Sequence, residues 1–345
     1  MTIEFKNITH SYGNHQVLNE LNFEARAGEI TCLLGGSGCG KSTLLRIAAG
    51  IEQLQHGAIY LDNKEFVTPN KQPAPERRPV GIMFQENALF PHMNIAQNIA
   101  FGLNKMSPSD KDPLVSQWLE RIGLSGYDKR YPHTLSGGQI QRVALARSLA
   151  PQPSVLLMDE PYASIDNVLR RQLRESARAL LKRAQATTIF VTHDPIEALE
   201  MADVIAVMES GKIVQSASPE VIFEKPESAV VASLFGDAIN IQARPCEGGF
   251  QTEYGFIQST QFSATKACTL VIRPEGLHMK TDKQSKLTVT DIRFAGNKWI
   301  LHLLPEQTDR KLEPLRVSSQ EIDNIGIGRQ VSIEAKSEGF FVFDN

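Results

Sequence analysis

The stretch Gly35-Gly-Ser-Gly-Cys-Gly-Lys-Ser42 lies between an apolar run at residues 28–34 and a run without helix breakers at residues 41–49. It fits the pattern G-x-x-x-x-G-K-[ST] in the strand–turn–helix context that this pattern requires, so an ordinary glycine-rich turn is a poor alternative. Glycines let successive backbone N–H groups converge on phosphate oxygens, and the following helix points its positive end at them. Lys41 is placed to neutralise β- and γ-phosphates, and the Ser42 hydroxyl to ligate Mg²⁺. The predicted nucleotide contacts are Gly35, Gly36, Ser37, Gly38, Cys39, Gly40, Lys41, Ser42 and Thr43.

A second apolar run, Val155-Leu-Leu-Met158, delivers two carboxylates at its carboxyl end, Asp159 and Glu160. Ligands of open α/β sheets bind outside that edge. We expect Asp159 to hold Mg²⁺, directly or through water. We expect Glu160 to polarise a water towards the γ-phosphate as a general base. By itself an Asp–Glu pair after a strand is as often a solvated turn, and the phosphate loop is what favours the catalytic interpretation.

The order of apolar and helical runs predicts the fold class. Strand-like runs at residues 28–34, 155–158 and 187–192 alternate with helical runs at residues 41–49 and 167–185. Alternation of this kind is typical of an α/β protein, in which helices cover a mainly parallel sheet.

Two further regions have a different texture. Residues 87–150 are mostly helical in pattern, which predicts a helical subdomain inserted into the α/β core. After residue 236, short β-rich runs separated by glycine, asparagine and proline predict a small all-β barrel. The sequence therefore predicts two domains, residues 1–236 and 237–345.

Composition excludes several classes of protein. The 36 basic and 39 acidic side chains leave a net charge of −3, which gives no electrostatic case for a nucleic-acid partner. No stretch approaches the ~20 apolar residues of a spanning helix, and the start has no secretory pattern. The four cysteines are widely scattered and form neither a metal spacing nor a disulfide framework. We therefore expect a soluble protein of a reducing compartment.

The stretch Leu135-Ser-Gly-Gly-Gln139 predicts a second anion-binding helix start, with Ser136 as its cap. Alone it would be an ordinary capped helix. Following the phosphate loop and preceding the acidic strand end, it makes a set that resembles the ATP-binding cassette (ABC) ATPases of ABC transporters. The remaining marks of that family are Tyr12 in Ser11-Tyr-Gly13, Gln85 in Met83-Phe-Gln-Glu86, Asp166 in Ser164-Ile-Asp166 and His193 in Thr192-His-Asp194.

Each of these marks has an ordinary alternative. Tyr12 alone would be a half-buried packing aromatic, Gln85 a surface amide and His193 a satisfied histidine near a strand end. Only the ordered set, over about residues 1–236, favours the family. Two mild departures are Gly36, where relatives often have proline, and Tyr162-Ala163, where they often have Phe-Ser or Leu-Ser.

The resemblance implies a role for each residue and a mixed, mainly parallel sheet. Tyr12 would stack on the adenine of ATP, and Gln85 would contact both Mg²⁺ and the attacking water. His193 would hydrogen-bond the γ-phosphate and orient Glu160. The family covers the γ-phosphate with the helix start of an opposite subunit, which implies a homodimer with two ATP molecules at its interface. The residues so placed at that interface are Ser136, Gly137, Gly138, Gln139 and Asp166.

The family also suggests a partner and a solute. Residues 87–101 would receive a helix of a transmembrane permease. The tail after about residue 238 resembles the β-barrel of maltose-, polyamine- and ferric-type importer ATPases, through Ile272-Arg-Pro-Glu275 and residues 287–304. The join Phe235-Gly-Asp-Ala-Ile-Asn240 is most similar to the ferric-iron group.

We therefore expect an ATP-hydrolysing subunit on the inner face of a membrane, served indirectly by a solute-binding protein outside it. Ferric iron is the first solute expected, and polyamine, sulfate or sugar remain open. A soluble ABC ATPase acting on nucleic acid or the ribosome is the remote alternative, because such proteins usually carry two cassettes or a long coiled-coil insertion. The β-barrel could in addition bind a regulator.

Overall fold

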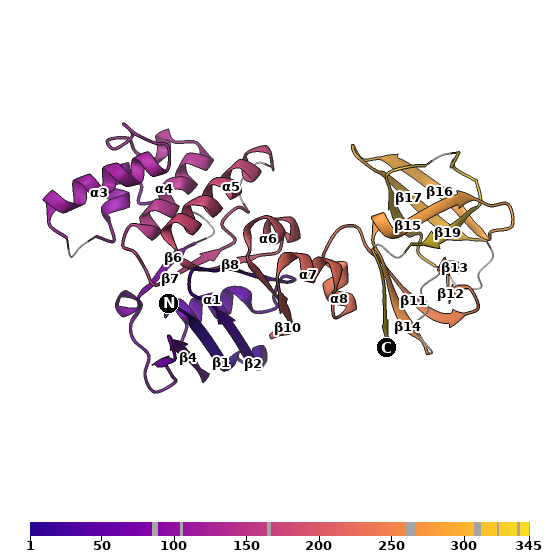
Figure 1. The fold of residues 1–345 in the computed structure, drawn as a ribbon, viewed down its shortest axis with the longest axis horizontal. Coiled ribbons are helices and arrows are strands. Elements are labelled where there is room, and N and C mark those ends of the chain that lie inside the picture. Colours follow the sequence, from indigo (N-terminus) through magenta and orange to yellow (C-terminus); the bar gives the residue numbers. More distant parts are fainter. Residues whose placement is uncertain are drawn as a thin grey trace. The chain divides into compact units, whose positions relative to one another are not determined.

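The computed structural model describes residues 1–84, 89–103, 106–163, 167–259, 266–306, 312–322, 324–336 and 339–344. The chain divides into two compact units, Met1–Glu220 and Val221–Asn345 (Figure 1). The predicted fold class is confirmed: a mixed α/β unit precedes a region built almost wholly of strands. Among the described helices, none combines the length and the apolar composition needed to cross a bilayer.

A six-stranded sheet in the order β10-β9-β3-β8-β7-β6 organises the first unit. Its strands run parallel except β10, which pairs antiparallel with β9. Every residue of β3, β7 and β8 is buried, which is why their sequences are runs of apolar residues and threonine, apart from Asp159 at the end of β7. The bounds are β3 Ile30–Leu34, β6 Val80–Met83, β7 Val155–Asp159, β8 Thr187–Thr192, β9 Val204–Glu209 and β10 Lys212–Ala217.

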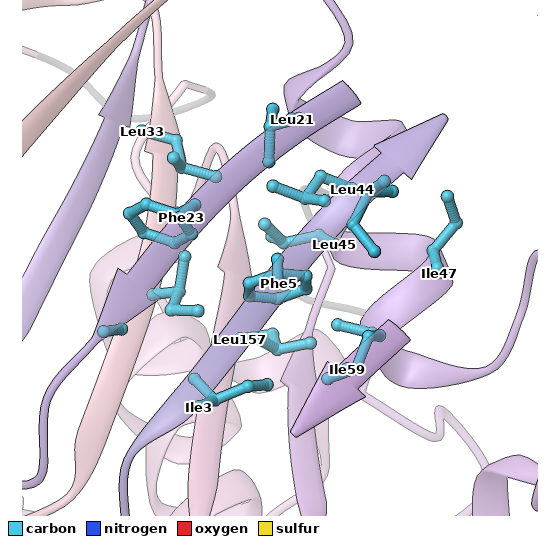
Figure 2. Close-up of a cluster of buried hydrophobic side chains, with 14 of the residues drawn as sticks. Ile3, Phe5, Leu21, Phe23, Leu33, Leu44, Leu45, Ile47, Ile59 and Leu157 are labelled. Atoms are coloured by element: carbon cyan, nitrogen blue, oxygen red, sulfur yellow. The ribbon is translucent and has the colours of Figure 1, made fainter. Parts of the chain in front are cut away.

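A second sheet, antiparallel and ordered β2-β1-β4-β5, completes the core of this unit. Helix α1 lies between the two sheets: Figure 2 shows Phe5 of the antiparallel sheet and Leu157 of the parallel one near Leu44 and Leu45 of α1. This packing holds the start of α1 at the edge where β3 and β7 end. The bounds are β1 Ile3–Tyr12, β2 His15–Ala25, α1 Lys41–Ala49, β4 His56–Leu61 and β5 Lys64–Val67.

Helices α2, α3 and α4 lie in the chain between β6 and β7, and α5 and α6 follow β7 and β8. Helix α4 contacts α2, α3, α5 and the strand β6. Helix α5 buries Leu173, Ala177 and Leu181 on one side, the spacing that its sequence predicts. The bounds are α2 Ile95–Ala100, α3 Pro108–Arg121, α4 Gly137–Leu149, α5 Asn167–Ala184 and α6 Pro195–Met201, with 3-10 turns at Pro75–Arg77 and Pro132–Thr134.

The second unit holds a seven-stranded sheet, β15-β19-β13-β12-β11-β14-β20, and a three-stranded sheet, β16-β17-β18. Apolar residues from both sheets, such as Phe250, Leu270 and Leu301, form one core. In β11, β13 and β19 buried residues alternate with more exposed ones. The bounds are β11 Ile239–Cys246, β12 Gly249–Thr252, β13 Gly255–Ser259, β14 Cys268–Ile272, a 3-10 turn Pro274–Gly276, β15 Leu277–Thr281, β16 Leu287–Phe294, β17 Trp299–Pro305, β18 Leu315–Ser319, β19 Val331–Ala335 and β20 Phe340–Asp344.

The two compact units divide between Glu220 and Val221, whereas the sequence predicts a domain boundary at residue 236. Helix α7, Pro219–Glu224, crosses this division, and α8, Ala229–Ser233, contacts β14 and β20 of the second unit. Arg273 explains that packing. Its side chain is 1% exposed and donates hydrogen bonds to the carbonyl oxygens of Phe223, at 2.7 Å, and Ala232, at 3.1 Å. The segment before residue 236 is therefore anchored to the β-strand unit.

Candidate nucleotide-binding site

The predicted phosphate loop connects β3 to α1 and is shaped by its glycines. Gly38 and Gly40 have φ values of 81° and 105°, which side chains rarely adopt. A Cβ on Gly40 would lie 2.7 Å from the carbonyl oxygen of Val17 in β2, so the β1–β2 hairpin packs against the loop. A Cβ on Gly36 would meet nothing within 4 Å, so the packing there leaves room for a side chain. Gly36, Ser37 and Gly38 are exposed to solvent, as a phosphate-binding surface must be.

Lys41 lies inside this loop. Its side chain is 6% exposed, and its Nζ donates hydrogen bonds to the carbonyl oxygens of Gly35 at 2.9 Å and Gly36 at 2.8 Å. The same ammonium lies 3.6 Å from the Cys39 Sγ. The N-cap of α1, Gly40, supplies no side-chain hydrogen bond to the helix start. The loop thus combines a buried ammonium with a helix start that has no side-chain cap, which suits an anion.

Ser42 and Asp159 meet at the mouth of the loop, although they are far apart in the sequence. The Ser42 Oγ donates a 2.8 Å hydrogen bond to Oδ1 of Asp159, which is the last residue of β7. Hydroxyl and carboxylate oxygens are hard ligands of the kind that Mg²⁺ prefers. The donor chemistry of this pair therefore fits the magnesium ion that accompanies a nucleoside triphosphate.

Glu160 and His193 form a second pair, one residue beyond β7 and β8. Oε1 of Glu160 accepts a hydrogen bond from Nδ1 of His193 at 3.1 Å. The Glu160 backbone has a φ of 43°, a left-handed conformation that costs energy for a residue with a side chain, and its N–H donates to Val191 O. Both side chains line a cavity of about 250 Å³ together with Arg170. A carboxylate held by an imidazole in a solvent-connected cavity is suited to accept a proton from water.

Ser136 begins α4 as predicted. Its Oγ accepts a hydrogen bond from the N–H of Gln139, and the Gln139 side-chain oxygen accepts one from the N–H of Ser136, which is a capping box. Ser136 and Gly137 are exposed and Gly138 is buried. Within the described part of the chain, no hydrogen bond or ion pair joins this helix start to the phosphate loop.

Tyr12 lies at the end of β1, opposite His15 in the hairpin that packs on the loop. Its side chain is 44% exposed, and its ring contacts the His10 ring edge-on with centroids 4.8 Å apart. Thr43 lies in the first turn of α1 and is partly buried. The predictions for Gln85 and Asp166 lie outside the described residues.

Glu197 is the residue that sequence reasoning missed. It lies in the first turn of α6, it is 4% exposed, and its carboxylate accepts a hydrogen bond from the Thr192 hydroxyl. Burial raises the pKa of the Glu197 carboxyl to about 7, against the lowering effect of that hydrogen bond. The available signal was Asp194-Pro-Ile-Glu197, which has the spacing of a capping box. That spacing predicts a local cap, and the structure directs the carboxylate to Thr192 instead.

The sequence of this chain matches a known protein family. Residues 18–163 match the sequence profile of the family described as ABC transporter. The sulfate/thiosulfate import ATP-binding protein CysA of Gloeobacter violaceus is 44% identical over 247 residues, which are 71% of this chain and 71% of the relative. The chain belongs to the ATP-binding proteins of ABC transporters. As a member of this family it binds ATP and is an ATPase whose hydrolysis is coupled to import.

Other members extend the comparison. The Fe(3+) ions import ATP-binding protein FbpC 1 of Pectobacterium atrosepticum is 36% identical over 304 residues, covering 86% of this chain and 85% of the relative. The solved structure of cbiO1 from Clostridium perfringens, part of the ABC transporter complex cbiONQ, has a TM-score of 0.59 at 31% identity. It covers 64% of this chain and 89% of that one. The named solutes of such ABC ATP-binding proteins thus differ between relatives of similar identity.

Proposed function

We propose that the pairs Ser42–Asp159 and Glu160–His193 form the hydrolytic centre of this ABC ATPase. The observation that carries the proposal is the 2.8 Å hydrogen bond between Ser42 and Asp159, which brings a phosphate-loop hydroxyl to the carboxylate of the neighbouring strand. Ser42 and Asp159 would hold Mg²⁺, joined in the family's pattern by Gln85. When bound, Mg²⁺ supplies positive charge to the phosphate oxygens. Lys41 would leave its carbonyl partners for the β- and γ-phosphates, and Tyr12 would stack on adenine.

Glu160 would act as the general base. Its carboxylate would take a proton from the water that attacks the γ-phosphate, while the Nδ1–H of His193 holds its orientation. That hydrogen bond has a consequence for His193. With its proton on Nδ1, a neutral ring has only a lone pair on Nε2, so it accepts there and does not donate. Donation to the γ-phosphate requires a second proton on the ring or a change of tautomer on ATP binding.

Replacing Glu160 by glutamine tests the base. Glu160→Gln keeps the size and polarity of the side chain and removes the proton acceptor, so we expect kcat for ATP to fall by about 100-fold or more with KM nearly unchanged. Glu175→Gln, in an exposed ion pair with Arg171 on α5, is the matched control. A Glu160→Gln chain that hydrolyses ATP as fast as the control contradicts the assignment.

A second copy of the chain would complete each site. The start of α4 is exposed and capped by its own side chains, so Gly137 is available to another molecule. We infer a homodimer in which Ser136, Gly137, Gly138 and Gln139 of one copy cover the γ-phosphate bound by the other, with Asp166 at the interface. ATP binding would then favour the closed pair, and hydrolysis would release it.

A permease and a membrane location follow from the same proposal. Residues 87–101 include α2 and Phe101, whose side chain is exposed. This segment would receive a helix of the transmembrane permease at the inner face of the membrane, and the permease would take solute from an external binding protein. The homodimer would in this way couple its closure to transport.

Two solutes are candidates. The join at residues 235–240 favours ferric iron, and two of the relatives are named as Fe(3+) ions import ATP-binding proteins. Sulfate is favoured by relatives named as sulfate/thiosulfate import proteins, one 44% identical over 71% of this chain and another 40% identical over 86% of it. We propose ferric iron first. Uptake of radiolabelled iron and of sulfate in a strain that lacks this chain separates them: unchanged iron uptake with lost sulfate uptake excludes iron.

A further inference from the structure

Glu197 lies in α6, four residues after His193, and takes no part in the proposed chemistry. Its Oε2 accepts a hydrogen bond from the Thr192 hydroxyl, and its Oε1 has no hydrogen-bond partner among the described residues. The side chain lines the same cavity of about 250 Å³ as Glu160 and His193. A carboxylate this deeply buried without a second partner is costly, so its retention requires a reason beyond packing.

The hydrogen bonds of Glu197 hold the turn that carries His193. The Thr192 hydroxyl donates to Glu197 and accepts a 3.0 Å hydrogen bond from the N–H of Asp194. Asp194 in turn caps α6, because its Oδ1 accepts from the N–H of Ile196 at 2.9 Å. Both neighbours of His193 are therefore fixed in one network that ends on the Glu197 carboxylate.

We propose that Glu197 is a positioning residue for His193: acting through Thr192 and Asp194, it fixes the ring that holds the proposed base Glu160. This inference rests on the proposed function of the Glu160–His193 pair. Since Glu197 is not among the residues proposed to bind ATP, its loss should lower turnover rather than the affinity for ATP.

The charge state of Glu197 sets how firmly it holds the turn. An ionised carboxylate only accepts hydrogen bonds, so the Thr192 hydroxyl must point to it and offer its lone pair to Asp194. A protonated carboxyl carries its own hydrogen and no longer imposes that direction. Burial brings the pKa of this carboxyl to about 7, so the change falls near neutral pH. We expect the turn to be held more firmly as the pH rises through this value.

The charged groups around Glu197 leave burial as the largest influence on the pKa of its carboxyl. Arg174 and Arg170 of α5 lower its pKa, but both also approach Asp194, at 3.9 and 3.7 Å, and Arg174 lies 2.8 Å from Glu200. These cations are shared with other carboxylates. The remaining titratable groups facing Glu197 are Asp194 itself, Cys32 of β3, Tyr162, and the Glu160 and His193 side chains of the common cavity.

Kinetics of the full-length chain between about pH 6 and pH 8.5 test the proposal. Glu197→Ala removes the acceptor, so we expect kcat to fall by about tenfold or more while KM for ATP stays within about twofold. Glu197→Gln keeps an acceptor for Thr192 and cannot ionise. It should restore most of the turnover lost in Glu197→Ala and lack the rise of kcat with pH, centred near pH 7, that we expect of the wild type. Glu175→Gln, again the control, should keep the wild-type profile.

Thermal unfolding gives a second measurement that does not depend on activity. The folded-state pKa of Glu197 is raised above 4.5, so the folded chain keeps its proton more strongly than the unfolded one. The stability that this contributes is complete below about pH 4.5 and is lost as the pH rises from there to about 7. The melting temperature of the wild type should therefore fall relative to Glu197→Gln over that range.

Two outcomes overturn the proposal: a Glu197→Gln chain with the wild-type pH profile, or a folded Glu197→Ala chain with wild-type turnover. If Glu197→Ala does not fold, the pH dependence of kcat for Glu197→Gln decides whether the proposal holds. Glu160→Gln is measured alongside. If it remains as active as the wild type, the proposed hydrolytic centre is wrong; if it is inactive while the Glu197→Gln profile is unchanged, only the role of Glu197 is wrong.

Discussion

Helices α1 and α4 both begin in glycine-rich sequence, yet the two starts are built differently. At α1 the N-cap is Gly40, which offers no side-chain hydrogen bond, and the Lys41 ammonium is buried against the loop carbonyl groups. At α4 the N-cap is Ser136, which exchanges hydrogen bonds with Gln139 while Ser136 and Gly137 remain exposed. The first start leaves its N–H groups without a side-chain cap, whereas the second caps the N–H of Gln139 with its own side chain.

The glycines at the two starts differ in the same way. A Cβ on Gly40 would approach the Val17 carbonyl oxygen and the Leu18 side chain at 2.7 Å, whereas a Cβ on Gly137 would meet nothing within 4 Å. The fold of this chain therefore requires Gly40 but places no demand on Gly137. A glycine that the chain itself does not need leaves room for another molecule to approach closely. The contrast between Gly40 and Gly137 therefore supports the proposed second copy at the start of α4.

The largest expected effect comes from removing the cation of the phosphate loop. Lys41→Ala takes away the only charge that the loop directs at the phosphates, so we expect ATP hydrolysis to fall by more than about 100-fold and ATP binding to weaken. Lys64→Ala, an exposed lysine on β5, is the control. Isothermal calorimetry and phosphate release measure the two effects. A Lys41→Ala chain that keeps half of its activity would remove the distinction between the two helix starts.

The same substitution at the two glycines sharpens the comparison. Gly40→Ala forces a side chain into a φ of 105° and against the Val17 carbonyl oxygen, so we expect a loss of about 3 kcal/mol of stability. Gly137→Ala should leave the melting temperature unchanged or slightly raised, because alanine is the better helix former and has room.

ATP hydrolysis then separates packing from the second copy. In the homodimer that we propose, the Gly137→Ala methyl group would stand between the α4 start and the γ-phosphate of the other copy. We expect about a tenfold loss of activity in a chain as stable as the wild type. Full activity of Gly137→Ala would mean that no phosphate approaches this surface.

The difference between the two starts also shows what the sequence can predict. The runs at residues 28–34, 155–158 and 187–192 predicted buried parallel strands, because strands buried on both faces have near-continuous apolar sequences, and the fold class is confirmed. The roles of the site residues stay predictions. Their placement at one sheet edge follows from parallel strands ending together.

What the sequence did not predict depends on tertiary contacts. The pattern Asp194-Pro-Ile-Glu197 satisfies the rule for a capping box, but α5 and β8 bury this carboxylate where the Thr192 hydroxyl is the nearer partner. The segment before residue 236 carries helical signals like those of the first unit. Its assignment to the second unit depends on Arg273, about forty residues further along the chain, which no local pattern connects to it.

The smallest expected effect concerns the capping box of the second start. Ser136→Ala removes the acceptor for the Gln139 N–H, and because Ser136 is exposed, water replaces it in part, so we expect about 1 kcal/mol of lost stability. Chemical denaturation of the chain measures this against Ser116→Ala, at an exposed position inside α3. If the two substitutions cost the same, the Ser136 cap does not stabilise α4, and the contrast with the uncapped start of α1 disappears.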